Sequence, residues 1–223
     1  MAIYENGPFG DFHGRHGNMV FYKLNGKTVG RQIGEIDPST YTVNQFAVRQ
    51  KTTLINPVLK ATKAYTRMGF KNSPKPGNWD FYSMATSMNN PGAITGDYPH
   101  QEVNHSKVIL SAGKITAPVS VGVRLINNAL EFTWTADLEN ENSHPRDQIM
   151  LCAYFPETEK ALTLLSGARR PEEQQLLPLP SFTHTMAIET YLSFVADDRS
   201  DVSNSVYGGR IIWDNSTEED GNL

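Results

Sequence analysis

The chain has 223 residues, enough for one large or two small domains, and its 39% hydrophobic and 20% charged residues are ordinary for a globular protein. The formal net charge of −4 argues against a nucleic-acid binder, because such proteins neutralise phosphates with an excess of Lys and Arg. The single cysteine, Cys152, excludes an intramolecular disulfide framework, and its apolar surroundings in the sequence predict a buried, unreactive thiol.

The sequence has no apolar stretch of membrane-spanning length and no pattern of a cleaved signal peptide. We therefore expect a soluble protein without membrane insertion, located in the cytoplasm or in a released particle.

Glycines recur every three or four residues near the start of the chain: Gly7, Gly10, Gly14 and Gly17. Glycine adopts positive φ at no steric cost, so this spacing predicts an irregular arm rather than a helix or a regular strand. His13 and His16, with Asp11, are candidate metal ligands in this arm. Two imidazoles rarely close a site alone, and we predict no metal here.

A β-hairpin is predicted directly after the arm. Residues 19–24 alternate in character, Asn25-Gly26 is the pair that a type I′ turn requires, and residues 27–31 form the returning strand. An isolated hairpin is marginally stable in water, so we expect it to pair with the rest of the chain or with a neighbouring subunit. The residues expected to make this contact, besides the four glycines, are Phe21, Tyr22, Asn25, Gly26 and Arg31.

Gly26-Lys27-Thr28 is similar to the end of a phosphate-binding loop, but Phe21 occupies the position of that loop's first glycine. The hairpin interpretation explains Asn25-Gly26 better, and we predict no nucleotide site.

Helical periodicity covers residues 44–68 and predicts two helices or one kinked helix. Asn56-Pro57 is typical of an N-cap followed by proline at the first helical position, and Gly69 of a C-terminal cap. Residues at spacings of three and four define one apolar face: Leu54, Val58, Ala61, Tyr65 and Met68. In the first part of the segment the residues expected to point inward are Phe46, Ala47, Leu54 and Ile55.

A shorter helix is predicted from Trp79 to Met88, with Asn78 as its cap. Its apolar residues are expected to face the core. Trp79 and Tyr82 are half-polar aromatics, and such residues also suit contact with a neighbour or a ligand.

From about His105 the periodicity becomes that of β-strands. Seven short strands separated by turn-forming segments predict a two-sheet sandwich, in which Trp134 points inward. This part resembles a fibronectin type III or immunoglobulin-like module, through Trp134, the strand containing Tyr191 and the segment 203–206. The expected strands are residues 107–110, 119–125, 130–135, 148–155, 161–165, 189–195 and 205–213.

The predicted fold class is therefore α+β. Residues 1–100 hold the glycine-rich arm, the hairpin and two to three helices, and residues 101–213 form the antiparallel β-sandwich. Residues 214–223 form a polar, acidic tail.

Several segments together resemble DUF6266, a family of uncharacterised Bacteroidota proteins. The resemblance runs nearly the full length and implies an N-terminal hairpin and helical portion before a C-terminal β-sandwich. It implies no activity. The segments that carry it are residues 10–18 (GDFHGRHGN), 20–31, 69–71, 94–99 (ITGDYP), 130–134 and 201–208 (DVSNSVYG).

No group of residues in the sequence is typical of catalysis. No serine has the sequence context of a nucleophile elbow, and the loop acids Glu139, Glu141 and Asp147 lack the ligand spacing of calcium loops. The histidines of the second half are scattered: His100, His105, His144 and His184. We expect no enzyme, no catalytic residue and no cofactor.

The leading hypothesis is a non-catalytic structural subunit that self-associates through the arm and hairpin, in a phage-derived or surface assembly. The alternative is a monomeric module that binds a glycan or peptide through sandwich loops or through Trp79 and Tyr82.

Overall fold

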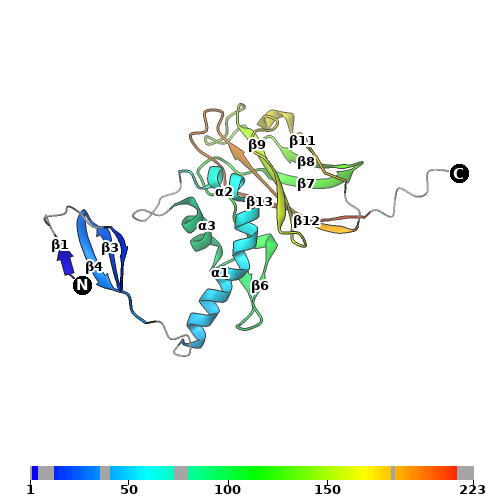
Figure 1. Ribbon diagram of the computed structural model, residues 1–223. Helices are drawn as coiled ribbons and strands as arrows, with labels where there is room; N and C mark the ends of the chain where they lie inside the picture. The colour runs from blue at the N-terminus through cyan, green and yellow to red at the C-terminus, as the bar shows by residue number, and fades with distance from the viewer. Residues whose placement is uncertain (1, 5–12, 36–40, 73–79, 182–183, 215–223) are drawn as a thin grey trace. The chain divides into compact units, whose positions relative to one another are not determined.

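The computed structural model describes residues 2–4, 13–35, 41–72, 80–181 and 184–214. They form two compact units, with unit 1 ending at Thr42 and unit 2 starting at Val43 (Figure 1). Sequence patterns placed the boundary near residue 100 instead. The structure divides the chain earlier because the helices share a hydrophobic core with the strands that follow them.

Unit 1 contains a four-stranded antiparallel sheet in the order β1-β4-β3-β2. The predicted hairpin is confirmed, and Asn25 and Gly26 at its turn both have positive φ, as a type I′ turn requires. The strands are β1 (Ala2–Tyr4), β2 (Gly14–His16), β3 (Met19–Leu24) and β4 (Lys27–Gln32).

The prediction of an irregular arm is wrong for its last part. Strand β2 pairs with the start of β3, and Gly17 has a φ of 58° at the first position of the two-residue turn between them. The edges of the hairpin are therefore paired within unit 1, by β1 and β2. Gly7 and Gly10 lie outside the described residues.

Unit 2 contains the predicted β-sandwich, and the α+β fold class is confirmed. One sheet has the order β10-β9-β12-β13, with β9 (Gln148–Phe155), β10 (Lys160–Leu164), β12 (Met186–Val195) and β13 (Val206–Trp213). The other has the order β11-β8-β7, with β7 (Val119–Ile126), β8 (Ala129–Thr135) and β11 (Gln174–Pro178).

The first of these sheets is covered on both faces. Alternate residues of β9, such as Ile149 and Leu151, pack against β8 across the sandwich, where Trp134 is buried as predicted. The residues between them, Met150 and Cys152, pack against the helices. Figure 1 shows the helices and the sheet of β7, β8 and β11 on opposite sides of β9 and β12.

The helical layer consists of α1 (Val43–Ala61), α2 (Lys63–Gly69) and α3 (Phe81–Asn89). The predicted helix start at Asn56-Pro57 is wrong, because α1 continues through Pro57 and ends near Thr62. The helix tolerates the proline because its neighbours Ile55, Val58 and Leu59 are buried against the core.

The third helix starts at Phe81, two residues later than predicted. The backbone N–H of Ser83 donates to Oδ1 of Asp80 at 2.8 Å, so Asp80 is the N-cap. The predicted cap Asn78 and the aromatic Trp79 lie outside the described residues.

The predicted strand at residues 107–110 is absent from the described structure, where the short 3-10 helix η2 (His105–Lys107) precedes an extended segment. The backbone of this extended segment is hydrogen-bonded by side chains instead of by a neighbouring strand. Asn89 accepts from the N–H of Ile109 and donates to its carbonyl, both at 2.8 Å, and Ser205 Oγ accepts from the N–H of Leu110. Two short strands, β5 (Ile94–Thr95) and β6 (Glu102–Val103), precede this segment.

Gly69 offers a test of the packing between α2 and the extended segment. A Cβ at Gly69 would overlap the carbonyl oxygen of Leu110 and Cβ of Ser111, and a backbone atom cannot rotate away. We expect Gly69→Ala to lower the free energy of unfolding in urea by about 1–3 kcal/mol, despite the better helix propensity of alanine. Gly92→Ala is the matched control, since a Cβ there meets nothing within 4 Å, and it should change stability by less than about 0.5 kcal/mol. Equal stability of the two variants would contradict the proposed close approach.

Candidate functional site

The apolar face of α1 continues beyond the core. Val58 and Leu59 near the end of the helix are buried, whereas Val43 and Val48 near its start are 65% and 59% exposed. Val48 lies seven residues before the buried Ile55, which places both on the same side of the helix. The apolar stripe is therefore covered over the second half of α1 and open to solvent over the first.

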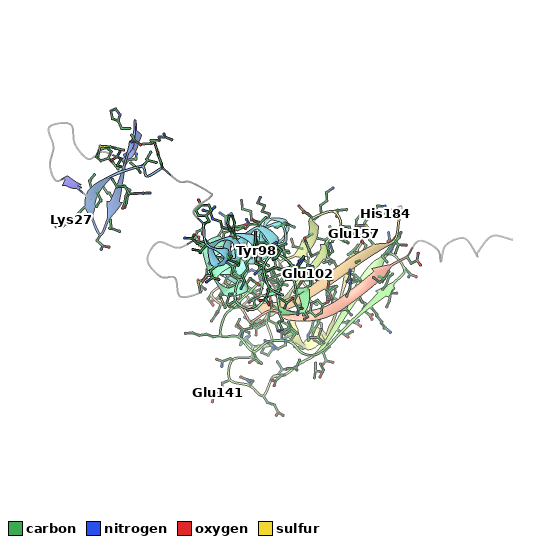
Figure 2. All side chains as sticks on the ribbon, turned by 90° about the horizontal axis from the view of Figure 1, so that it is seen from below. Lys27, Tyr98, Glu102, Glu141, Glu157 and His184 are labelled. Atoms are coloured by element: carbon green, nitrogen blue, oxygen red, sulfur yellow. The ribbon has the colours of Figure 1, made fainter. Side chains whose placement is uncertain are left out.

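An aromatic pair lies at this open end. The rings of Phe46 and Tyr98 stack with centroids 6.0 Å apart, and the two residues are 37% and 39% exposed. Sequence periodicity predicted that Phe46 points into the core, and this is wrong. We call Val43, Phe46, Ala47, Val48 and Tyr98 the α1 patch. Figure 2 shows Tyr98 at the helical part of unit 2.

A groove of about 380 Å³ runs between the first half of α1 and the turn that carries Tyr98. It holds one cationic and one anionic side chain, Lys51 and Asp97. The residues lining it are Val43, Asn44, Ala47, Val48, Lys51, Gly96, Asp97, Tyr98 and Gln101.

The groove also holds an unpaired acceptor. Gln101 is only 6% exposed, and its Oε1 accepts no hydrogen bond from any described residue. Nearby, Gln50 donates from Nε2 to the carbonyl of Pro99 at 2.7 Å, but its own Oε1 is likewise without a donor there. A buried amide oxygen without a donor is costly, but both oxygens are shielded from solvent, so they offer no contact to an occupant of the groove.

The structure places the predicted contact residues of unit 1 in the sheet and its turns. Gly14, Gly17 and Gly26 have positive φ, which gives them a conformational role. The ring of Phe21 lies over Gly30 on the neighbouring strand, where a Cβ would meet it at 2.7 Å. Tyr22 and Arg31 lie on the other side of the sheet, opposite Val29 and Val20 respectively.

Tyr82 has a partner inside unit 2. Its hydroxyl donates to Oδ1 of Asn56 at 2.9 Å and so joins α3 to α1. Burial raises the pKa of this hydroxyl. The side chain that was expected to contact a neighbour or ligand therefore also stabilises the helical layer.

The fold brings together one cluster of titratable groups that sequence reasoning missed. Glu189 on β12 is 2% exposed, accepts from the hydroxyl of Tyr207 at 2.6 Å and lies 3.5 Å from Nε of Arg210. The carbonyl of His105 accepts from the hydroxyl of Tyr191 at 2.9 Å. No local motif could have revealed the cluster, because its members come from η2, β12 and β13.

The loop acids do not form a shared cation site. Asp147 is buried and accepts from Nη2 of Arg170 at 3.0 Å, whereas Glu139 and Glu141 are exposed. Figure 2 shows Glu141 at the edge of the molecule. Among the described residues there is no group of three or more His, Cys, Asp or Glu placed to hold a metal ion. His13 and His16 are exposed, and Asp11 lies outside the described residues.

Arg170 is fully buried, and its guanidinium lies 3.8 Å from the ring centroid of Phe194. Its backbone carbonyl accepts from Nε1 of Trp134 at 2.9 Å. This arrangement ties the segment before β11 to the sandwich core, so we assign it a structural role. Cys152 is also buried as predicted, and burial raises the pKa of its thiol.

None of the helices that the structure describes combines the length and the apolar character needed to span a membrane.

A family model described as "Family of unknown function (DUF6266)" matches residues 16–209 of the chain. None of the curated proteins matches it. The matched range includes the α1 patch, the groove and the sandwich, and it leaves out the glycines before His16.

The environment of His105 predicts how stability depends on pH. Burial lowers the pKa of His105, Glu189 opposes this shift, and Arg210 reinforces it. In the unfolded chain His105 has its ordinary pKa near 6.5, so it binds a proton more readily there than in the folded chain. The folded state therefore loses stability as the pH falls below about 6.5. We expect the free energy of unfolding to fall less between about pH 7 and 5.5 in His105→Gln than in the unmodified chain. His100→Gln, at an exposed position, is the control and should keep the full decrease. The same decrease in both variants would refute a role for His105.

Proposed function

The chain belongs to the DUF6266 family, whose function is unknown, so we propose a function from the surfaces of the chain itself. We propose that it is a non-catalytic structural protein that self-associates, with the α1 patch as the contact between two copies.

The open apolar end of α1 is the observation that carries this proposal. The other exposed large apolar residues described in unit 2 come from separate strands and loops: Val119, Leu138, Leu176 and Ile212. The α1 patch instead brings Val43, Phe46 and Tyr98 together, since Val43 and Phe46 are about one helical turn apart and the rings of Phe46 and Tyr98 stack. Scattered apolar residues are normal on protein surfaces, whereas a contiguous patch with aromatic members is typical of an interface.

A second copy is the occupant that the groove favours. Two copies related by a two-fold axis bring the same surface together, so the patch must complement itself. Apolar side chains can meet across such an axis, and Lys51 of each copy can pair with Asp97 of the other. Support for self-association therefore comes from α1, because the hairpin edges in unit 1 are already paired.

We expect the unmodified full chain to show a molar mass that rises toward twice that of one chain as concentration increases in light scattering. The double variant Val43→Glu/Phe46→Glu places two carboxylates on neighbouring positions of the apolar contact and should remain monomeric over the same range. Burying an unpaired charge costs several kcal/mol, which corresponds to at least about a hundredfold weaker association.

Leu176→Glu is the matched control, since Leu176 is 50% exposed on β11 and lies outside the α1 patch. It should associate like the unmodified chain. A monomeric unmodified chain at every concentration, or equal loss of association in the control, would overturn the proposal.

The pairing of charges has its own test. Lys51→Asp or Asp97→Lys alone places like charges together at the axis and should weaken association by about fivefold or more. The double variant Lys51→Asp/Asp97→Lys restores opposite charges and should recover most of the lost affinity. If the loss of affinity in the double variant equals the sum of the two single losses, the two-fold arrangement is ruled out. The apolar contact is then judged by the preceding experiment.

A further inference from the structure

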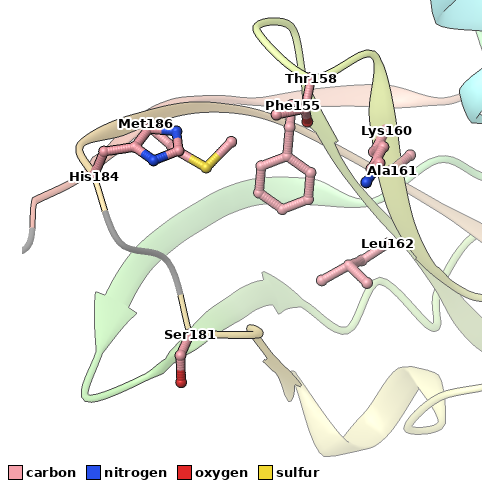
Figure 3. A pocket seen from close by; sticks show the side chains of 8 residues that line it. All are labelled: Phe155, Thr158, Lys160, Ala161, Leu162, Ser181, His184 and Met186. Atoms are coloured by element: carbon pink, nitrogen blue, oxygen red, sulfur yellow. The ribbon is translucent and has the colours of Figure 1, made fainter.

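A pocket of about 310 Å³ lies where the inter-sheet core of the sandwich opens at one end. Figure 3 shows the ring of Phe155 pointing into it between Met186 and Leu162, with Ser181 on the facing loop. The residues lining the pocket are Phe155, Thr158, Lys160, Ala161, Leu162, Ser181, His184 and Met186.

The floor of this sandwich-end pocket is apolar. Phe155 and Met186 are 3% and 2% exposed and belong to the inter-sheet core, and Leu162 packs against the same core. An apolar ligand group in the pocket would thus extend a hydrophobic core that already exists. Its volume is at the lower end of the range for small-molecule sites.

The rim of the sandwich-end pocket is polar and cationic. Lys160 is exposed at the start of β10, and Thr158 adds a hydroxyl to the rim. No carboxylate is among the lining residues, all of which the structure describes. Glu157 and Glu159 belong to the adjoining turn, but neither is among the residues lining the pocket.

From this arrangement we propose that the sandwich-end pocket binds a small monocarboxylate with an apolar body. The apolar body contacts Phe155, Leu162 and Met186, and the carboxylate meets the ammonium group of Lys160. A carboxylate bound by an ammonium and a hydroxyl receives charge-assisted hydrogen bonds, which are stronger than neutral ones. The chemistry differs from the glycan or peptide that sandwich loops were expected to hold, because the floor offers no polar groups to several hydroxyls or amides.

The experiment is a titration of the full chain, labelled with ¹³C at its methionine methyl groups, with sodium octanoate. Met186 lines the pocket, and its signal is assigned by loss in Met186→Leu. We expect octanoate to shift the Met186 signal saturably and to leave that of Met19 in unit 1 unchanged. Octan-1-ol has the same chain without the carboxylate and should bind about fivefold or more weakly.

Lys160→Gln should weaken octanoate binding by a similar factor and leave octan-1-ol binding unchanged, whereas Lys160→Arg should retain both. Lys160 is exposed, so these variants are expected to fold normally. An unmoved Met186 signal would overturn the proposal, as would equal binding of octanoate and octan-1-ol. Octanoate affinity that is the same in Lys160→Gln as in the unmodified chain would also overturn it.

Discussion

The fold of unit 2 depends on one constraint, the burial of a single sheet on both of its faces. Every residue of β12 is buried, and successive residues of β9 belong alternately to the helical core and to the inter-sheet core. A sheet in this position must be apolar on both sides, and any polar group on it needs a partner. Tyr65 and Ser193 show the consequence, because their hydroxyls bond at 2.6 Å where α2 meets β12.

Much of this architecture could be predicted from the sequence, and the failures have physical causes. The alternation of Leu130, Phe132 and Trp134 identified β8 because that strand has only one buried face. The apolar run of β9 was recognised as a strand, but its second buried face, which carries Met150 and Cys152, is not visible as alternation. The strand predicted at 107–110 failed because Asn89 and Ser205, distant in sequence, pair its backbone with side chains.

The candidate interaction site was harder to predict than the fold. The periodicity of α1 correctly gave an apolar face, but a sequence does not show where the neighbouring sheet ends. Phe46 and Ile55 were both expected to point inward, but they lie nine residues apart and therefore on opposite sides of the helix, so the packing that buries Ile55 leaves Phe46 exposed. In unit 1 a local signal was available, since Gly17-Asn18 separates two short strands as a hairpin turn does. The glycines before it obscured that turn.

The two proposed sites use different parts of unit 2. The α1 patch involves α1 and the turn at Tyr98, whereas the sandwich-end pocket involves β9, β10 and the start of β12, and Figure 2 shows Tyr98 and His184 apart. Strand β10 lies between the two cores, since Ala161 packs against the helical core and Leu162 against the inter-sheet core, and both residues line the pocket. Contact through a well-packed strand does not by itself couple two sites, because coupling requires an element with two discrete arrangements. The α1 patch and groove share no residue with the sandwich-end pocket, so we expect self-association and ligand binding to be thermodynamically independent.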